Sequence, residues 1–201
     1  QDILLEWGID PGENEQTQDR KARLVIEQLK RLYSTQKELF ETKTFSDRDS
    51  LAGRQTNLAD ITDDLSRQSF MSALLKFGLH DVAALQYKAA EAIVSDNDSQ
   101  TQYQQEALDM LSVMIGFAAN QLAEGTPGND SEKRLLATHT ETLSLVRLLQ
   151  QRIHAEVNPL LQLPDLTDQQ NQQLNVLVQR QAAVVEAMNQ FTGSKGEPSN
   201  E

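Results

Sequence analysis

Apolar residues recur at steps of three and four along most of the chain, which is the spacing of one face of an α-helix. In residues 15–43 this stripe includes Val25, Leu29, Leu32 and Leu39. Comparable stripes run through residues 46–77, 79–94, 99–124, 130–157 and 167–193. The pattern predicts an all-α protein with about six amphipathic helices.

The expected helix ends coincide with residues that stop or cap helices. Gly78 is placed to close the second helix, because glycine adopts the backbone conformation of a helix C-terminus at no steric cost. Pro159 and Pro164 are expected to end the fifth. Capping boxes, in which a Ser or Thr precedes Glu or Gln by three residues, are expected at Ser99 with Gln102 and at Thr167 with Gln170.

Short connections favour antiparallel neighbours, so the helices group into three hairpins: one with two, three with four, and five with six. Residues 1–14 form an acidic and apolar lead-in, and 15–193 form the bundle. Its possible sub-units are 15–124 and 130–193. Residues 194–201 are a polar tail that we expect to be disordered.

The fifth helix has a heptad seam, with apolar residues at alternating steps of three and four. Such a seam pairs with another helix as readily as with a neighbour in its own chain. We therefore take it as the candidate interaction seam, with two glutamines, Gln150 and Gln181, as polar interruptions in this helix and the next. Its candidate residues are Leu136, Leu143, Val146, Gln150, Ile153 and Val157. Met110 and Met114, on one face of the fourth helix, are expected in the core.

Composition narrows the possible partners. The formal net charge is −12, which opposes binding to nucleic acid and to anionic lipid. No apolar run approaches the roughly 18 residues that a membrane-spanning helix needs, so we expect no direct membrane insertion by this chain. There is no Cys, which fits an exported bacterial protein. The first residue is Gln1 rather than Met, which fits cleavage of a signal peptide and equally an excised part of a longer chain. A protein partner or self-association is the remaining expectation.

The sequence contains no catalytic template. His80, His139 and His154 are not preceded at three residues by Glu, so the Glu-x-x-His motif of di-iron bundles is absent. His139 falls on the seam, where a core role is expected, and His80 is expected to be exposed. Phosphate-binding glycine loops and nucleophile elbows are also missing. We expect no catalytic residues, no metal and no cofactor, and hence no enzyme.

Two resemblances concern the first four helices. Residues 77–83 with 87–92 resemble the middle of a tetratricopeptide unit, with Gly78 at its turn, which implies a short helical-repeat adaptor that binds a peptide. Residues 20–124 are similar to helical, Gln- and Ala-rich extracytoplasmic segments of uncharacterised bacterial membrane-associated proteins. The residues that carry this second resemblance are 51–60, Met71, Ala73, Leu74, Ala83, Gln86, Ala89, Gln105, Ala107 and Leu108. It implies a periplasmic or cell-envelope location.

The sequence thus predicts a non-enzymatic helical scaffold or protein-interaction module of the bacterial cell envelope. The peptide-binding adaptor is the alternative, with a groove centred on the second to fourth helices. The sequence leaves open whether the helices form one bundle or two sub-bundles.

Overall fold

The computed structural model describes residues 15–42, 48–68, 71–124 and 131–193. For residues 15–19, 121–124, 131–139 and 190–193 it describes the backbone and not the side chains. Within these ranges the chain forms six helices and no strand. They are α2 (Glu15–Glu41), α3 (Arg48–Ser66), α4 (Ala73–Val94), α5 (Ser99–Glu124), α6 (Ser131–Leu161) and α7 (Asp168–Gly193). The predicted all-α class is confirmed.

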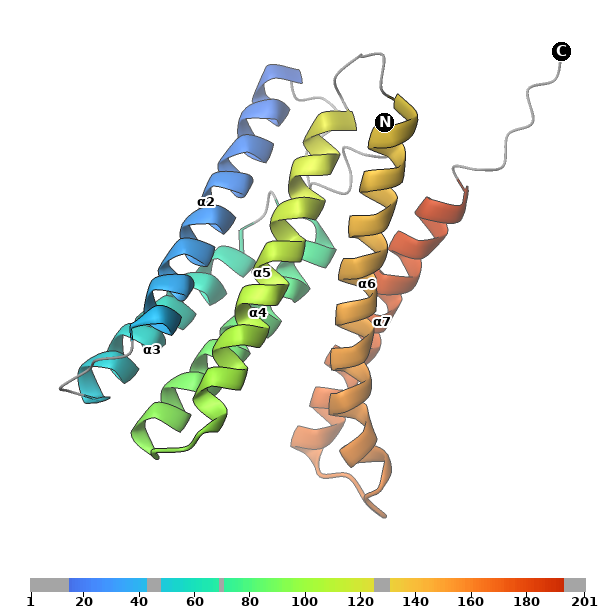
Figure 1. Ribbon diagram of the computed structural model, residues 1–201. Helices are drawn as coiled ribbons and strands as arrows, with labels where there is room; N and C mark the ends of the chain where they lie inside the picture. Colours follow the sequence, from blue (N-terminus) through green and yellow to red (C-terminus); the bar gives the residue numbers. More distant parts are fainter. Residues whose placement is uncertain (1–14, 43–47, 69–70, 125–130, 194–201) are drawn as a thin grey trace, which may run out of the picture.

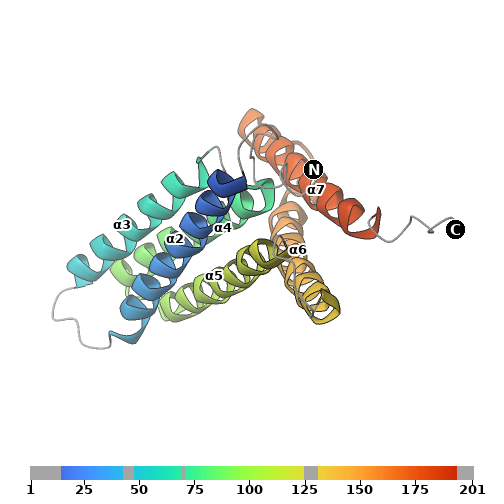
Figure 2. The ribbon, with the colours of Figure 1, turned by 90° about the horizontal axis from the view of Figure 1, so that it is seen from above.

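Helices α2 to α5 pack side by side as a four-helix bundle (Figure 1). Helix α3 lies against α4 along most of its length, and α2 lies chiefly against α5 rather than α3. The α6–α7 hairpin flanks this bundle and is inclined to it, with α6 on α5 (Figure 2). Because α2 and α3 touch each other least among neighbouring pairs in the bundle, the surface between them is open.

Leucine and other aliphatic side chains fill the bundle where the heptad stripes meet. Leu29 of α2, Leu75 and Leu79 of α4 and Leu111 of α5 are fully buried. Met114 is fully buried and Met110 nearly so, which confirms their place in the core. Full burial of one such side chain stabilises the fold by about 1.5–3 kcal/mol. The interior therefore depends on aliphatic packing more than on aromatic rings.

The second and third predicted helices have the wrong boundary. Helix α3 ends at Ser66 and α4 runs from Ala73 straight through Gly78. The break is set by Ser72, whose hydroxyl caps α4 by accepting a hydrogen bond from the Leu75 amide at 3.3 Å. Gly78 serves packing: a Cβ there would lie 2.9 Å from the Met114 Sδ. The tetratricopeptide-like turn expected at Gly78 is therefore not formed.

The two predicted capping boxes have different outcomes. At the start of α7 the box forms, because the Thr167 amide donates to Gln170 Oε1 at 2.8 Å and the Gln170 amide donates back to the Thr167 hydroxyl at 3.3 Å. At the start of α5 it does not form: the Ser99 amide donates to Asn97 Oδ1 at 3.0 Å, and Gln102 binds another side chain.

The fifth predicted helix is longer than expected. Helix α6 continues through Pro159 to Leu161. Pro159 lies in the last turn, where its missing amide removes one hydrogen bond. The next side chain, Leu160, is buried, so packing holds this last turn in place.

Candidate interaction surfaces

A layer of four buried glutamines crosses the centre of the α2–α5 bundle. Gln36, Gln55, Gln86 and Gln104 come one from each helix, and none is more than 4% exposed. Gln36 and Gln55 bind each other reciprocally, at 2.9 and 3.3 Å. Gln86 donates to Gln36 Oε1 at 3.1 Å, and Gln104 donates to Gln55 Oε1 at 3.0 Å. The layer aligns all four helices at one level, because a shifted helix would leave buried amides without partners.

Sequence reasoning identified two other glutamines as polar seam positions and missed this layer. Gln150 is exposed and Gln181 half-buried, so neither lies in a core layer. The signal that could have identified the layer is the position of each glutamine within the apolar repeat of its helix. Gln36, for example, stands four residues after Leu32 and three before Leu39, both of them buried. A polar residue at such a position is typical of a device that fixes helix alignment.

A buried arginine ties the hairpin to the bundle. Arg180 of α7 is 3% exposed and donates through Nη2 to Asp81 of α4, which is 4% exposed. Its Nη1 lies 3.4 Å from Glu156 of α6, so one guanidinium joins three helices. Nearby, Arg152 of α6 pairs with Glu106 of α5 at 2.5 Å. Charged contacts thus supplement the apolar packing between the hairpin and the bundle.

Burial changes the titration of the acid in this cluster. Desolvation raises the pKa of Asp81 from 3.8 to about 6, against the opposing attraction of Arg180. The nearby Glu156 carboxylate raises the pKa further, while Arg152 and His80 lower it. Compared with the unfolded chain, the folded protein favours the protonated form of Asp81. The carboxyl group therefore titrates near pH 6 rather than near pH 4.

The candidate seam on α6 divides between core and surface. Val146 and Ile153 are buried at 6% exposure each, and Val157 is partly buried against the core. Leu143 is 41% exposed and Gln150 is exposed. The side chains of Leu136 and His139 lie outside the described residues.

Most exposed large apolar side chains of the described residues belong to the hairpin and its connection. Six of the ten lie between residues 143 and 185, and only Leu143 among them was part of the candidate seam. The six are Leu143, Leu161, Leu163, Val176, Val178 and Val185. The hairpin packs on the bundle through one side only, and this leaves apolar side chains on its other surfaces.

One exposed face of α7 repeats the heptad spacing. Val178 and Val185 are seven residues apart and 61% and 46% exposed, with exposed Ala182 between them. This spacing places the three side chains in one line along the helix. The flanking Asn175 is exposed and uncharged. We call Val178, Ala182 and Val185 the α7 stripe.

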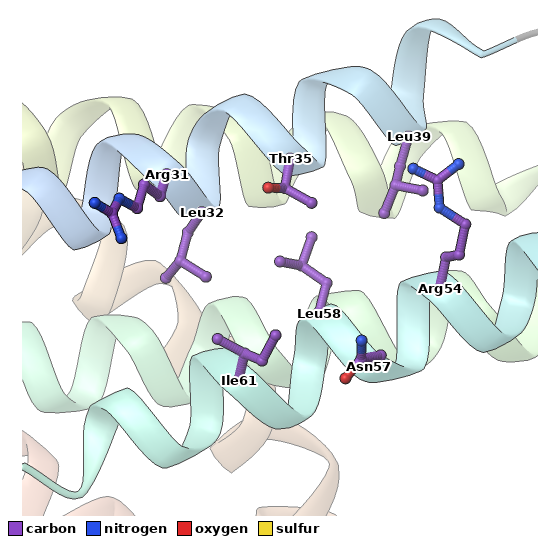
Figure 3. Close-up of a pocket in the computed structure, with 8 residues that line it drawn as sticks. All are labelled: Arg31, Leu32, Thr35, Leu39, Arg54, Asn57, Leu58 and Ile61. Atoms are coloured by element: carbon purple, nitrogen blue, oxygen red, sulfur yellow. The ribbon is translucent and has the colours of Figure 1, made fainter.

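A groove of about 260 Å³ opens between α2 and α3 (Figure 3). Its apolar part is formed by leucines that point between the two helices, and a guanidinium stands at each end. It thus lies between the first and second helices, not across the second to fourth as the adaptor hypothesis expected. The lining residues are Arg31, Leu32, Thr35, Leu39, Arg54, Asn57, Leu58 and Ile61.

The two histidines whose side chains are described, His80 and His154, belong to no metal-binding cluster. His80 is 59% exposed, as expected, and its Nδ1 lies 3.5 Å from Asp63; His154 is also exposed. Within the described residues no three His, Cys, Asp or Glu side chains cluster in a way that could hold a metal ion. Over the same ranges, no helix combines the length and hydrophobicity needed to cross a bilayer.

Comparison of the chain with protein-family models, with curated proteins and with solved structures finds no match.

Proposed function

We propose that this chain is a non-enzymatic helical scaffold or protein-interaction module of the bacterial cell envelope, and that the α6–α7 hairpin presents its partner-binding surface. The supporting observation is the concentration of exposed apolar side chains on this hairpin. Contiguous apolar side chains at a surface mark sites of protein association, and on this hairpin Val178, Ala182 and Val185 follow one another along α7. The envelope location rests on the absence of Cys and on the resemblance of residues 20–124.

The α7 stripe is the best-defined part of this surface. Val178, Ala182 and Val185 have the spacing with which one helix packs along another. The chain as a whole is strongly acidic, but the side chains of this stripe carry no charge. The stripe itself therefore adds no charge repulsion to the approach of a helix of a partner or of a second copy.

The test compares two exposed valines of equal accessibility. Val178 is 61% exposed on the stripe, and Val94, at the end of α4, is 64% exposed. We expect Val178→Asp to abolish partner capture or self-association, measured by pull-down with the full chain and by light scattering over a wide concentration range. Val94→Asp should behave like the unmodified chain. Helix content by circular dichroism should be unchanged in both.

Core positions of the same hairpin are unsuitable for this test. Val146→Asp would place a carboxylate at a site that is 6% exposed and destabilise the fold, whereas Leu143→Asp probes the exposed edge of the seam. Identical capture and identical mass for the Val178, Leu143 and Val94 variants would refute the proposed surface.

A further inference from the structure

The α2–α3 groove is an apolar surface separate from the hairpin. Leu32 and Leu58 form its floor and are almost fully buried, while Ile61 at its edge is 51% exposed (Figure 3). An exposed isoleucine above buried leucines offers further apolar contact to any chain that covers it. The groove is only partly enclosed, so it suits a peptide segment laid over it.

A guanidinium stands at each end of the groove, and each is held in an exposed ion pair. Arg31 pairs with Glu27 at 2.6 Å, and Arg54 pairs with Glu38 at 2.8 Å. These side chains are 44–75% exposed, and exposed pairs of this kind contribute little to stability. Each guanidinium has five N–H donors, so it has capacity for a second carboxylate. The groove is therefore suited to bind an apolar segment that has an acidic residue near each end.

The spacing of the arginines limits the spacing of those acids. Arg54 reaches the level of Glu38, seven residues beyond Arg31 along α2, which is about 10 Å. In an extended chain, carboxylates four residues apart are separated by about 13 Å. Flexible arginine side chains cover the difference.

The leading segment of the chain has this pattern. Asp2 and Glu6 are four residues apart, and no basic residue precedes Arg20. Between and beside the acids, Ile3, Leu5 and Trp7 alternate with other residues. Because side chains alternate in an extended chain, these three would face one way and Asp2 and Glu6 the other. With the apolar three against the groove, the acids would lie on the outer side, where the long, exposed side chains of Arg31 and Arg54 would fold over the segment to meet them.

We propose that the α2–α3 groove is the docking site for residues 2–7 of the same chain, with Glu6 bound by Arg31 and Asp2 bound by Arg54. The connection is long enough. Arg31 lies sixteen residues from the start of α2 at Glu15, about 24 Å along the helix. The nine residues from Glu6 to Glu15 span up to about 30 Å when extended. The segment then runs antiparallel to α2 and covers Ile61.

Trp7 provides the measurement, because it is the sole tryptophan of the chain. With the full chain, we expect Trp7 fluorescence at shorter wavelength and severalfold less acrylamide quenching than in the urea-unfolded protein. Ile61→Asp should remove this protection by placing a carboxylate in the groove. Val94→Asp, at an exposed site outside the groove, is the control.

Charge reversal tests the pairing itself. Glu6→Arg and Arg31→Glu should each raise quenching of Trp7, and the double variant should restore protection. Circular dichroism checks that helix content is retained, so that lost protection cannot be confused with unfolding.

Three results would overturn the proposal. One is a Trp7 as open to acrylamide in the unmodified chain as in the unfolded chain, and another is protection that survives Ile61→Asp. The third is protection that grows with protein concentration together with the mass, since that places the segment of a second copy in the groove. None of these outcomes bears on capture through the α7 stripe.

Discussion

The glutamine layer makes a quantitative prediction, because its members have unequal roles. Gln55 Oε1 accepts hydrogen bonds from two neighbours, Gln36 and Gln104. Gln86 only donates to Gln36, and its own Oε1 is buried without a partner. Replacement by methionine, which is unbranched and similar in length, removes the amide while filling the space. The same substitution should therefore have different effects at positions 55 and 86.

Gln55→Met takes away the acceptor used by two buried amide groups. A buried donor without its partner costs about 1–3 kcal/mol, so the loss in unfolding free energy should be about 2–6 kcal/mol. Gln86→Met removes one bond to Gln36 Oε1, which still accepts from Gln55, and it also removes an unpartnered oxygen. Its effect should lie within about 1 kcal/mol of zero.

Urea unfolding followed by circular dichroism measures both changes. The midpoints should separate while the slopes stay equal, since the folded and unfolded surfaces change little. Equal losses for the two variants, or a larger loss for Gln86→Met, would refute the hydrogen-bond assignment within the layer.

Three further predictions, at Gly53, Gly78 and Asp81, use the same unfolding assay. Gly53→Ala should raise the unfolding free energy by about 0.5–1 kcal/mol, since a Cβ at this position in α3 meets nothing within 4 Å and alanine favours helix. Gly78→Ala should lower the unfolding free energy, because the added Cβ would lie 2.9 Å from Met114 Sδ. Equal effects at the two glycines would contradict the close packing of α4 on α5. The pKa of Asp81 is raised from 3.8 to about 6, so the folded state holds its proton more tightly than the unfolded state does. The contribution of Asp81 to the unfolding free energy should therefore increase by about 3 kcal/mol as the pH falls through 6 towards 4. Asp81→Asn resembles the protonated acid and can still accept a hydrogen bond from Arg180, so this variant should lack the increase in stability at low pH. If the stability difference between Asp81→Asn and the unmodified chain does not change with pH, the assigned pKa shift is wrong.

Periodicity was sufficient for the helical class of the protein. The three-and-four spacing of apolar residues predicted an all-α fold, and the starts of α5, α6 and α7 were predicted to within a residue because loop and cap residues mark them. Predictions from local residue type were wrong where tertiary packing determines the helix boundary. Gly78 looks like a helix end, yet it lies inside α4, since Met114 needs the space of the missing Cβ.

The candidate surfaces were predicted less completely. The heptad seam pointed to α6, where Val146 and Ile153 are buried and Leu143 is exposed, but the exposed stripe of α7 was not singled out. Which side of an amphipathic helix faces a neighbour depends on the angle between the helices, and no residue pattern within one helix records that angle.

The sequence by itself determined the helices, their approximate ends and the acidic, cysteine-free character of the chain, because these follow from local periodicity and composition. Only the tertiary structure decided that four glutamines meet in one layer, that Arg180 joins Asp81 and Glu156, and that α2 and α3 stand apart. Residues as far apart as Asp81 and Arg180 come together through the packing of whole helices. Their contact depends on the summed burial of many side chains and cannot be derived from either residue's neighbours in the chain.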